Sequence, residues 1–461
     1  MLAANDTGSR PPEGLSGRQL KEKLQELRRT DNSTNWFYVG RAYAVISVAV
    51  AIAVAFHQWT IAHALSPWWN VPVVILAAIA VGASQHQLAG ATHEATHYIL
   101  FRNPLLNELV SDWLCLFPLF SSTYMFRLHH LAHHQYINDP ERDPDFSQLR
   151  RSGHWLEFPV SKAAFLRTLL RQLSLYPLVK YMVVRARYAS LGKIDNNPYA
   201  EHAREFSPWP RRLAVTYLGI LAPGMVWASR GGGLVWLTML PLVGIALVTG
   251  GLLTVPCRRY PVSRLRPVIS ARTTLISRVV YVTLLFTAIA WAEYLTAARV
   301  WRYFFLLWLV PLFTTFSFFM ILRQLVQHGN GDRGRLTNTR TFLVNPFIRY
   351  AVFPFGMDYH LPHHLFATVP HYRLPELHAL LMRYPEYRGQ GTVVEGYFFP
   401  RAGGRSGRNP TVLEVLGPLY TRNGGDVFID HSVLEGSQLA GSEAHGATVS
   451  GTRARRNNSP S

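Results

Sequence analysis

The chain has 461 residues, of which 49% are hydrophobic and 16% are Asp, Glu, Lys or Arg. Soluble domains carry roughly 25% of such charged residues, so this composition argues against a soluble globular protein. The net charge of +19 does not indicate a nucleic-acid partner, because the basic residues flank long apolar runs in the manner of a polytopic membrane protein.

Both ends of the chain are polar. Residues 1–35 form a predicted polar arm whose mixed charge does not match a cleavable signal peptide. Within it, the pattern of residues 20–27 fits either a short amphipathic helix on the membrane surface or a solvated basic tail. We predict a membrane domain over residues 36–400. Residues 401–461 are rich in Gly, Ser and Arg, and they are predicted to be a mostly disordered tail.

The predicted membrane domain holds six apolar segments that are long enough to be candidate spans. They lie at about residues 42–64, 71–100, 213–229, 232–254, 275–296 and 303–322. A helix over 71–100 would be about 45 Å long at about 1.5 Å per residue, against a hydrocarbon core roughly 30 Å thick. Its C-terminal end is therefore expected to leave the bilayer. Residues 109–120 are apolar but too short to span, and residues 146–212 are predicted to form amphipathic surface helices.

The distribution of Lys and Arg predicts the orientation of these segments. With the N-terminus in the cytoplasm, six crossings place the loops 65–70, 229–233 and 293–302 outside. Nearly all Lys and Arg then lie inside, as the positive-inside rule requires. We therefore expect an all-α fold, namely a polytopic membrane helical bundle with a helical cap on the cytosolic side.

Three histidine clusters stand out along the chain. They comprise His93 and His97, then His130, His133 and His134, and finally His360, His363 and His364. Imidazoles at positions i, i+3 and i+4 share one face of a helix, so each H-x-x-H-H cluster can point at one metal centre. The predicted orientation rests on Lys and Arg and not on histidine, yet it places all three clusters on the cytosolic side. Eight imidazoles are too many for one ion and suit two.

Two other functions fit only part of this pattern. His93-Glu94-x-x-His97 also matches the zinc protease pattern, but that function would leave six histidines without a role. A histidine-rich metal transporter would place its ligands near the bilayer midplane, whereas these clusters lie beyond the apolar runs. Imidazole suits iron, zinc, copper or nickel, so the ligands alone do not name the metal. His328 leaves the last apolar segment at the same level, either as a ninth ligand or as a polar helix end.

Two stretches carry a family resemblance. The first is Phe126-Arg127-Leu128-His129-His130-Leu131-Ala132-His133-His134 followed by Asp143-Pro144-Asp145, and the second is Tyr359-His360-Leu361-Pro362-His363-His364-Leu365-Phe366. Over roughly residues 40–385 the chain resembles the membrane fatty acid desaturase/hydroxylase superfamily, most closely its bacterial lipid desaturases and rhizopine-oxygenase-like group. It departs from the family pattern at Gly356 and Ala367, and its six apparent crossings exceed the usual four.

The resemblance implies a centre of two non-haem iron ions. Carried over by position, the ligands would be His93, His97, His130, His133, His134, His328, His360, His363 and His364. Gln324 stands where some members hold a water molecule with Asn, and the spacing from Arg127 selects His130 rather than His129 as a ligand. Asp139, Asp143 and Asp145 are expected either to orient ligand N–H groups or to serve as turn and capping residues before proline.

The implied reaction is the O2-dependent desaturation of a fatty acid or lipid acyl chain, with hydroxylation of a lipid or hydrocarbon on the same centre as the alternative. Electrons must come from a separate donor of ferredoxin or cytochrome type. The only cysteines, Cys115 and Cys257, stand alone, so the sequence predicts no iron–sulfur cluster, and no dinucleotide fingerprint is found. Basic residues that include Arg150, Arg151 and Arg171 are predicted to dock this donor.

Overall fold

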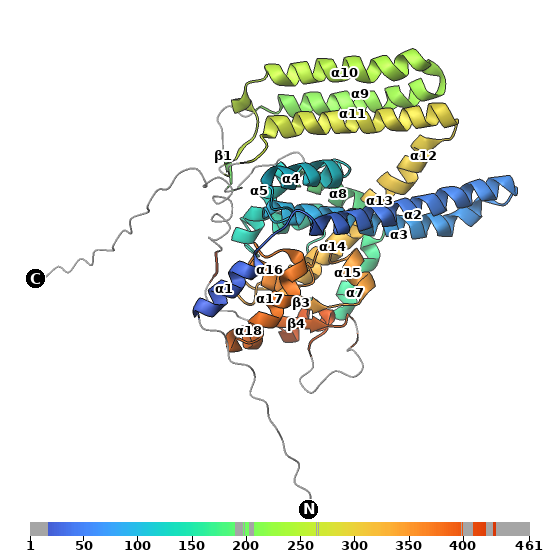
Figure 1. Cartoon of the computed structure of the whole chain (residues 1–461). Coiled ribbons are helices and arrows are strands. Elements are labelled where there is room, and N and C mark those ends of the chain that lie inside the picture. The colour runs from blue at the N-terminus through green and yellow to red at the C-terminus, as the bar shows by residue number, and fades with distance from the viewer. Residues whose placement is uncertain are drawn as a thin grey trace, which may run out of the picture.

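The computed structural model describes residues 17–189, 197, 199–201, 207–263, 265, 267–397, 399, 409–420 and 427–429, and it consists mostly of helices (Figure 1). Residues 1–16 of the predicted arm and residues 436–461, the part of the predicted tail with least capacity to form a core, lie outside the described residues.

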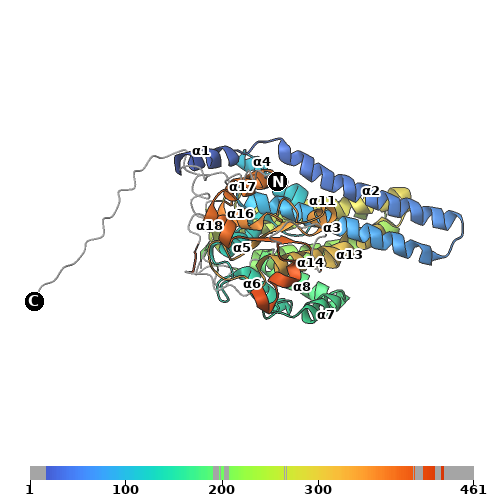
Figure 2. The ribbon, with the colours of Figure 1, turned by 90° about the horizontal axis from the view of Figure 1, so that it is seen from below.

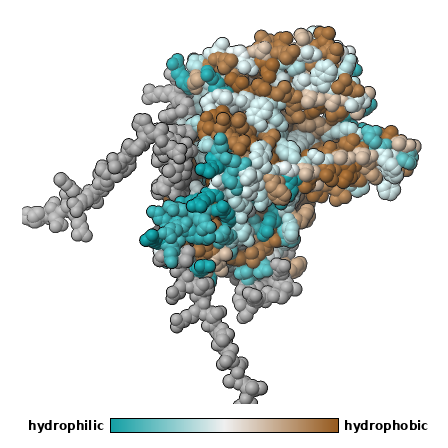
Figure 3. Space-filling view, in the orientation of Figure 1, coloured by the Kyte–Doolittle hydropathy of each residue, from teal (hydrophilic) through white to brown (hydrophobic). Residues whose placement is uncertain are grey.

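Long apolar helices form one part of the molecule. They are α2 (Thr34–Ala62), α3 (Asn70–Thr96), α9 (Trp209–Trp227), α10 (Leu234–Thr254), α11 (Ala271–Thr296) and the broken series α12 (Val300–Phe304), α13 (Val310–Phe313) and α14 (Thr315–His328). Helices α9, α10 and α11 lie side by side, and the α2–α3 pair extends in the same general direction (Figures 1 and 2). Apolar side chains cover both groups of helices on the face in Figure 3, whereas polar side chains gather near α1 and α18.

Among the described residues, five helical segments are long and apolar enough to cross a membrane. They are Thr34–Ala62, Pro67–Thr96, Leu234–Thr254, Ala271–Thr296 and Val300–His328. The predicted segment 213–229 is not among them, because its helix α9 begins with Trp209-Pro210-Arg211-Arg212, and these residues lower its mean hydropathy. Helix α9 nevertheless packs through Leu221 and Met225 against Leu237 of α10 and Phe286 of α11.

Shorter helices form a cap at one end of these spans. They are α1 (Gly17–Leu27), α4 (Pro104–Val110), α5 (Thr123–Gln135), α6 (Pro144–Ser152), α7 (Lys162–Gln172), α8 (Leu175–Ala189), α15 (Pro346–Ala351), α16 (His360–Leu365), α17 (Leu374–Leu381), α18 (Pro385–Gln390) and α19 (Val412–Val415). Two short strand pairs join them: β1 (Ala200–Glu201) is antiparallel to β2 (Val262–Ser263), and β3 (Arg340–Leu343) is parallel to β4 (Thr392–Glu395). The apolar stretch 109–120 begins in the last residues of α4 and continues as a π-helical turn over Ser111–Leu116. It does not form a helix long enough to span the membrane.

A polar run in the interior of α3 satisfies backbone groups where neighbouring segments break. Gln85 donates to the carbonyl of Trp308, which lies in the π-helical turn Phe305–Leu309. Gln87 donates to the carbonyl of Tyr350 in α15. A freed carbonyl in a membrane protein needs an internal partner, so these side chains allow irregular backbone to lie beside the metal-site helices.

Helix α1 packs on the cap. Leu27 is only 1% exposed, and it clusters with Leu361 and Leu374 around the third histidine cluster. Lys23 Nζ lies 2.9 Å from Glu376 Oε1 on α17. The predicted alternatives, a helix on the membrane surface and a solvated tail, both missed this contact, because a local pattern does not name the partner of an apolar face.

Part of the predicted C-terminal tail is also packed. Helix α19 buries Val412, Leu413 and Val415 against a cluster that includes Phe165 and Phe342. The described residues 409–420 therefore belong to the folded cap, beyond the boundary that composition indicated.

Candidate metal centre

The structure brings the nine predicted ligand histidines into two buried groups. Group one comprises His93, His97, His130, His134 and His363, and group two comprises His133, His328, His360 and His364. Within each group, one nitrogen from every ring lies within 4.8 Å of the others. Helices α3, α5, α14 and α16 supply the histidines, with His97 directly after the end of α3. Segments more than 200 residues apart in the sequence therefore meet here. Each group can hold a metal ion.

The two H-x-x-H-H motifs are divided between the groups in a reciprocal way. His130 and His134, four residues apart on α5, belong to group one, while His133 between them belongs to group two. On α16 the assignment is reversed, because His360 and His364 belong to group two and His363 to group one. Each motif therefore reaches both groups, which explains why this spacing occurs twice.

The two groups are direct neighbours. The rings of His134 and His364, one from each group, stack with their centroids 4.1 Å apart. His133 and His134 are adjacent in sequence and point into different groups. This arrangement suits two ions held close together.

The nitrogen atoms within each group fit a shared cation. Four Nε2–Nε2 pairs lie close together: His97–His130 at 3.0 Å, His134–His363 at 3.1 Å, His328–His360 at 2.9 Å and His360–His364 at 3.1 Å. Nitrogens that each bind one ion at about 2.1 Å, as in zinc sites, lie roughly 3 Å apart at a right angle. His93 has no hydrogen-bond partner for either of its buried ring nitrogens. A metal ion would satisfy one of these two nitrogens.

Burial favours the neutral form of these rings. It lowers the pKa of His130, His134 and His360 well below the ordinary value, and neighbouring histidines lower it further. A histidine must be neutral to bind a metal through a ring nitrogen. The surroundings of these three rings therefore keep them in the form that binds metal.

Asp143 lies behind one of the rings. The Nδ1 atom of His133 lies 3.0 and 3.1 Å from the two carboxylate oxygens of Asp143. The same carboxylate accepts hydrogen bonds from the backbone N–H groups of Asn138 and Asp145. Burial alone would lower the pKa of His133, but Asp143 and Asp145 outweigh it and raise that pKa to about 9. Asp143 thus fixes the ring and directs its Nε2 into group two.

The remaining predicted site residues lie around the groups. His129 belongs to neither group, and its Nε2 lies 2.7 Å from Asp145 Oδ1. Gln324 lies one turn before His328 and accepts a hydrogen bond of 2.6 Å from the Tyr181 hydroxyl. Asp139 turns away from the histidines, because its carboxylate contacts Arg142 at 2.7 Å and Arg333 at 2.8 Å. The structure therefore places Asp139 as a turn residue.

Two buried carboxylates support the site in ways that the sequence did not predict, since Glu94 was noted only as part of the zinc protease pattern and Glu108 not at all. Glu94 accepts a hydrogen bond of 2.8 Å from the backbone N–H of His371, so it links the first cluster to the segment after the third. Glu108 pairs with Arg127 on α5, with Arg127 Nη1 lying 3.0 Å from Glu108 Oε2. The sequence did hold a signal for Glu108, because it is an acidic residue within the short apolar stretch that follows Pro104.

Arg127 ties the helices of the first two clusters together. Beyond its pair with Glu108, it donates to the backbone carbonyls of Ala95 at 2.7 Å and Thr96 at 3.2 Å. These carbonyls end helix α3 between His93 and His97. The arginine of the second motif thus holds the end of the helix that carries the first.

The chain is similar to known proteins. The model of the family described as fatty acid desaturase matches residues 67–256 and 250–394. A dihydrorhizobitoxine desaturase of Bradyrhizobium elkanii is 32% identical over 149 residues, which are 32% of this chain and 38% of the relative. A sphingolipid delta(4)-desaturase of Komagataella phaffii is 34% identical over 101 residues, which are 21% of this chain and 27% of the relative. The matched stretches span well under half of either relative.

Proposed function

This chain belongs to the fatty acid desaturase family, and from that premise we propose that it is a membrane-bound di-iron enzyme that desaturates an acyl chain of a fatty acid or lipid. Its desaturase-named relatives make it an oxidoreductase of desaturase or oxygenase type. The observation that carries the proposal is the pair of adjacent, buried histidine groups at the end of apolar helices.

Nine histidines of the two groups would hold two iron ions. Iron bound there would supply the O2-dependent oxidation of an unactivated C–H bond. The chain itself contributes orientation and exclusion of water, since all nine rings are buried. Asp143 holds the His133 ring, and the Arg127–Glu108 pair holds α5 against the end of α3. A fixed, water-free site of this kind favours attack on one chosen carbon.

An acyl substrate fits a site at the end of helices that are apolar enough to span the bilayer. One relative is named for a sphingolipid and the other for dihydrorhizobitoxine, so the substrate class differs between named relatives. We assign the acyl chain because a chain dissolved in the membrane can reach the cap without entering water.

The test is lipid analysis of a host that expresses this chain beside hosts that express His133→Ala and His63→Ala. His133 belongs to group two, whereas His63 is exposed and bonds only to the Trp59 carbonyl. A product that lacks two hydrogens should form with the native chain and with His63→Ala but not with His133→Ala. A product that gains one oxygen atom instead would establish the hydroxylase alternative. A product that persists in His133→Ala would refute both.

The cap is proposed to lie on the cytoplasmic side and to receive electrons from a ferredoxin or cytochrome. Arg150 and Arg151 at the end of α6 and Arg171 near the end of α7 are exposed, which suits an acidic partner. Reversal of these charges should slow turnover with the native donor, most strongly at low salt. Unchanged turnover would exclude this surface.

A further inference from the structure

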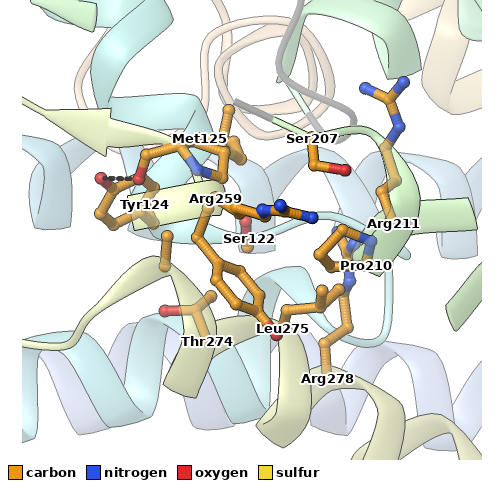
Figure 4. A pocket seen from close by; sticks show the side chains of 13 residues that line it. Ser122, Tyr124, Met125, Ser207, Pro210, Arg211, Arg259, Thr274, Leu275 and Arg278 are labelled. Atoms are coloured by element: carbon orange, nitrogen blue, oxygen red, sulfur yellow. Dashed lines mark hydrogen bonds between the residues drawn. The ribbon is translucent and has the colours of Figure 1, made fainter. Parts of the chain in front are cut away.

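A small cavity separate from the metal centre lies where α5 meets the membrane helices α9 and α11. It is lined by residues at the start of these helices and by the loop 257–261 (Figure 4). No histidine lines it. The Tyr124 hydroxyl donates to the carbonyl of Pro261 at 3.0 Å, so this loop is tied to α5 beside the cavity.

The polar lining of this cavity is cationic. Arg211, Arg259 and Arg278 contribute guanidinium groups from α9, the loop and α11. In Figure 4, the guanidinium groups of Arg259 and Arg278 turn toward the space beside Pro210, while Arg211 points away. No Asp or Glu lines the cavity. Clustered cations with no acidic group in the lining favour an anionic ligand.

Hydroxyl groups complete the lining. Ser122 is 2% exposed and stands at the N-cap of α5, but its side chain does not cap the helix. Serine at this position normally accepts a hydrogen bond from the first turn, so the Ser122 hydroxyl is left for another partner. Thr274, 5% exposed, and Ser207 add two more hydroxyls.

The size of the cavity limits what it can hold. Its volume is about 60 Å³. One ordered water needs roughly 10–15 Å³ of such volume, so the cavity holds about four to six atoms of that size. A tetrahedral oxoanion with five non-hydrogen atoms fits, whereas an acyl chain does not.

We propose that this cavity is a phosphate-binding site, with Arg259 and Arg278 facing the anion and the Ser122 hydroxyl as a further donor. Arginine guanidinium groups match phosphate oxygens in charge and geometry. The phosphate belongs either to the headgroup of a membrane lipid or to a soluble phosphate compound. The site does not depend on the proposed desaturase reaction, because none of its residues belongs to a histidine group.

A bound phosphate would join three elements. Arg259 lies in the turn after α10, Arg278 lies on α11, and Ser122 begins α5, the helix of the second histidine cluster. The anion would contact Arg259 and Arg278 and hold the α9–α11 helices against the helix that carries His130, His133 and His134. The expected consequence is a phosphate-dependent rise in thermal stability of the whole protein.

The test uses the full-length protein, purified in a maltoside detergent without phosphate. Thermal unfolding is measured with inorganic phosphate and with sodium chloride of equal ionic strength. Lipid phosphorus that remains bound to each chain is measured in parallel. The variants are Arg259→Gln and Ser122→Ala, with Arg258→Gln as the matched control, because Arg258 is the exposed neighbour that does not line the cavity.

Two results would support the site and identify the source of the anion. For a lipid headgroup, native protein and Arg258→Gln should retain more lipid phosphorus than Arg259→Gln or Ser122→Ala. For a soluble phosphate, bound lipid phosphorus should be equal in all four, and inorganic phosphate should stabilise the native protein. The phosphate concentration that gives half of the maximal stabilisation should then rise about tenfold in Arg259→Gln, because this variant loses one charge-assisted contact with the anion. If phosphate acts only as sodium chloride does and bound phosphorus is the same throughout, no phosphate site exists there.

Discussion

Asp143 holds a group-two histidine through both of its carboxylate oxygens, at 3.0 and 3.1 Å from His133 Nδ1. We predict that Asp143→Asn lowers iron affinity or turnover by about 10–100-fold, the usual effect of losing a partner that orients a metal ligand. The amide keeps the shape of the side chain but loses the charge that favours an Nδ1–H donor. Iron content per purified chain and turnover with one acyl substrate would measure the change.

Asp139 provides the matched control for this prediction. It is another aspartate of the same connecting segment, buried at 4% exposure, but it contacts Arg142 and Arg333 rather than a histidine. Asp139→Asn should therefore leave the iron content of the folded protein near the native value. Equal iron loss in Asp139→Asn and Asp143→Asn would mean that the segment as a whole, and no particular carboxylate, supports the centre.

At the scale of single residues, the sequence predicted most of what the structure assembles, because helical spacing is local. All nine histidines could be proposed from spacing and family resemblance, and the structure brings all nine together. The reciprocal division of each motif could not be foreseen, since it depends on how α5 faces α16. The contrast between Asp139 and Asp143 was equally hidden, because both precede a proline within one turn-rich segment.

At the scale of elements, Arg127 and Glu108 form a buried pair that joins α5 to α4. Removing one partner of such a pair leaves an unpaired buried charge and costs about 3–5 kcal/mol. We predict that Glu108→Leu destabilises the protein by that amount. Glu108→Leu combined with Arg127→Met should be less harmful than the sum of the two single changes. Thermal unfolding of the four proteins, including the native one, gives the coupling energy.

The rescue in the double variant should be partial. Arg127 also donates to the carbonyls of Ala95 and Thr96 at the end of α3, and methionine cannot replace those bonds. Iron content should therefore stay below native even where thermal stability recovers. A strictly additive double variant would show that the two side chains do not act as a pair.

Helix α1 offers a second prediction at this scale. Leu27 is 1% exposed in a cluster with Leu361 of α16 and Leu374 of α17. We predict that Leu27→Ala destabilises the protein by about 2–5 kcal/mol, the cost of a buried leucine truncation. Lys21→Ala on the exposed side of the same helix should have little effect. Thermal unfolding would compare them, and equal stability of both variants would show that α1 does not pack on the cap in solution.

The sequence predicted the existence of these elements better than their partners. An amphipathic helix was one of two alternatives for residues 20–27. The apolar membrane segments were predicted because length and composition are local properties. The contacts of α1 and α19 with the cap join segments far apart in the chain. No single-sequence pattern specifies such contacts, so both segments were assigned to polar ends.

At the scale of the whole molecule, the histidine groups constrain how often the chain crosses the membrane. If only the five most apolar segments crossed, His328 would emerge on the side opposite to His133. The two residues lie in one group with their ring centroids 4.7 Å apart. An even number of crossings is therefore required, and we predict that α9, which packs beside α10 and α11, supplies the sixth.

The two cysteines make this topology testable with almost no engineering. Cys115 is fully buried, and Cys257 is exposed in the turn after α10. If α9 crosses, Cys257 lies on the side of the histidine groups. A membrane-impermeant maleimide should then label native protein only from that side. Ser66→Cys in a Cys257→Ser background is the control, because the exposed Ser66 lies in the turn between α2 and α3 and should react only from the opposite side.

The comparison does not depend on which side is the cytoplasm, because it asks only whether the two positions react from the same or from opposite sides. Maleimide labelling is measured in sealed vesicles of both orientations, and permeabilised vesicles show the labelling when both sides are accessible. Labelling of Cys257 and of Ser66→Cys from one side would mean that α9 does not cross. The loop 257–261 would then be separated from α5 by the bilayer, which contradicts the hydrogen bond between the Tyr124 hydroxyl and the Pro261 carbonyl. Labelling from opposite sides would place the phosphate cavity and the histidine groups on one face of the membrane.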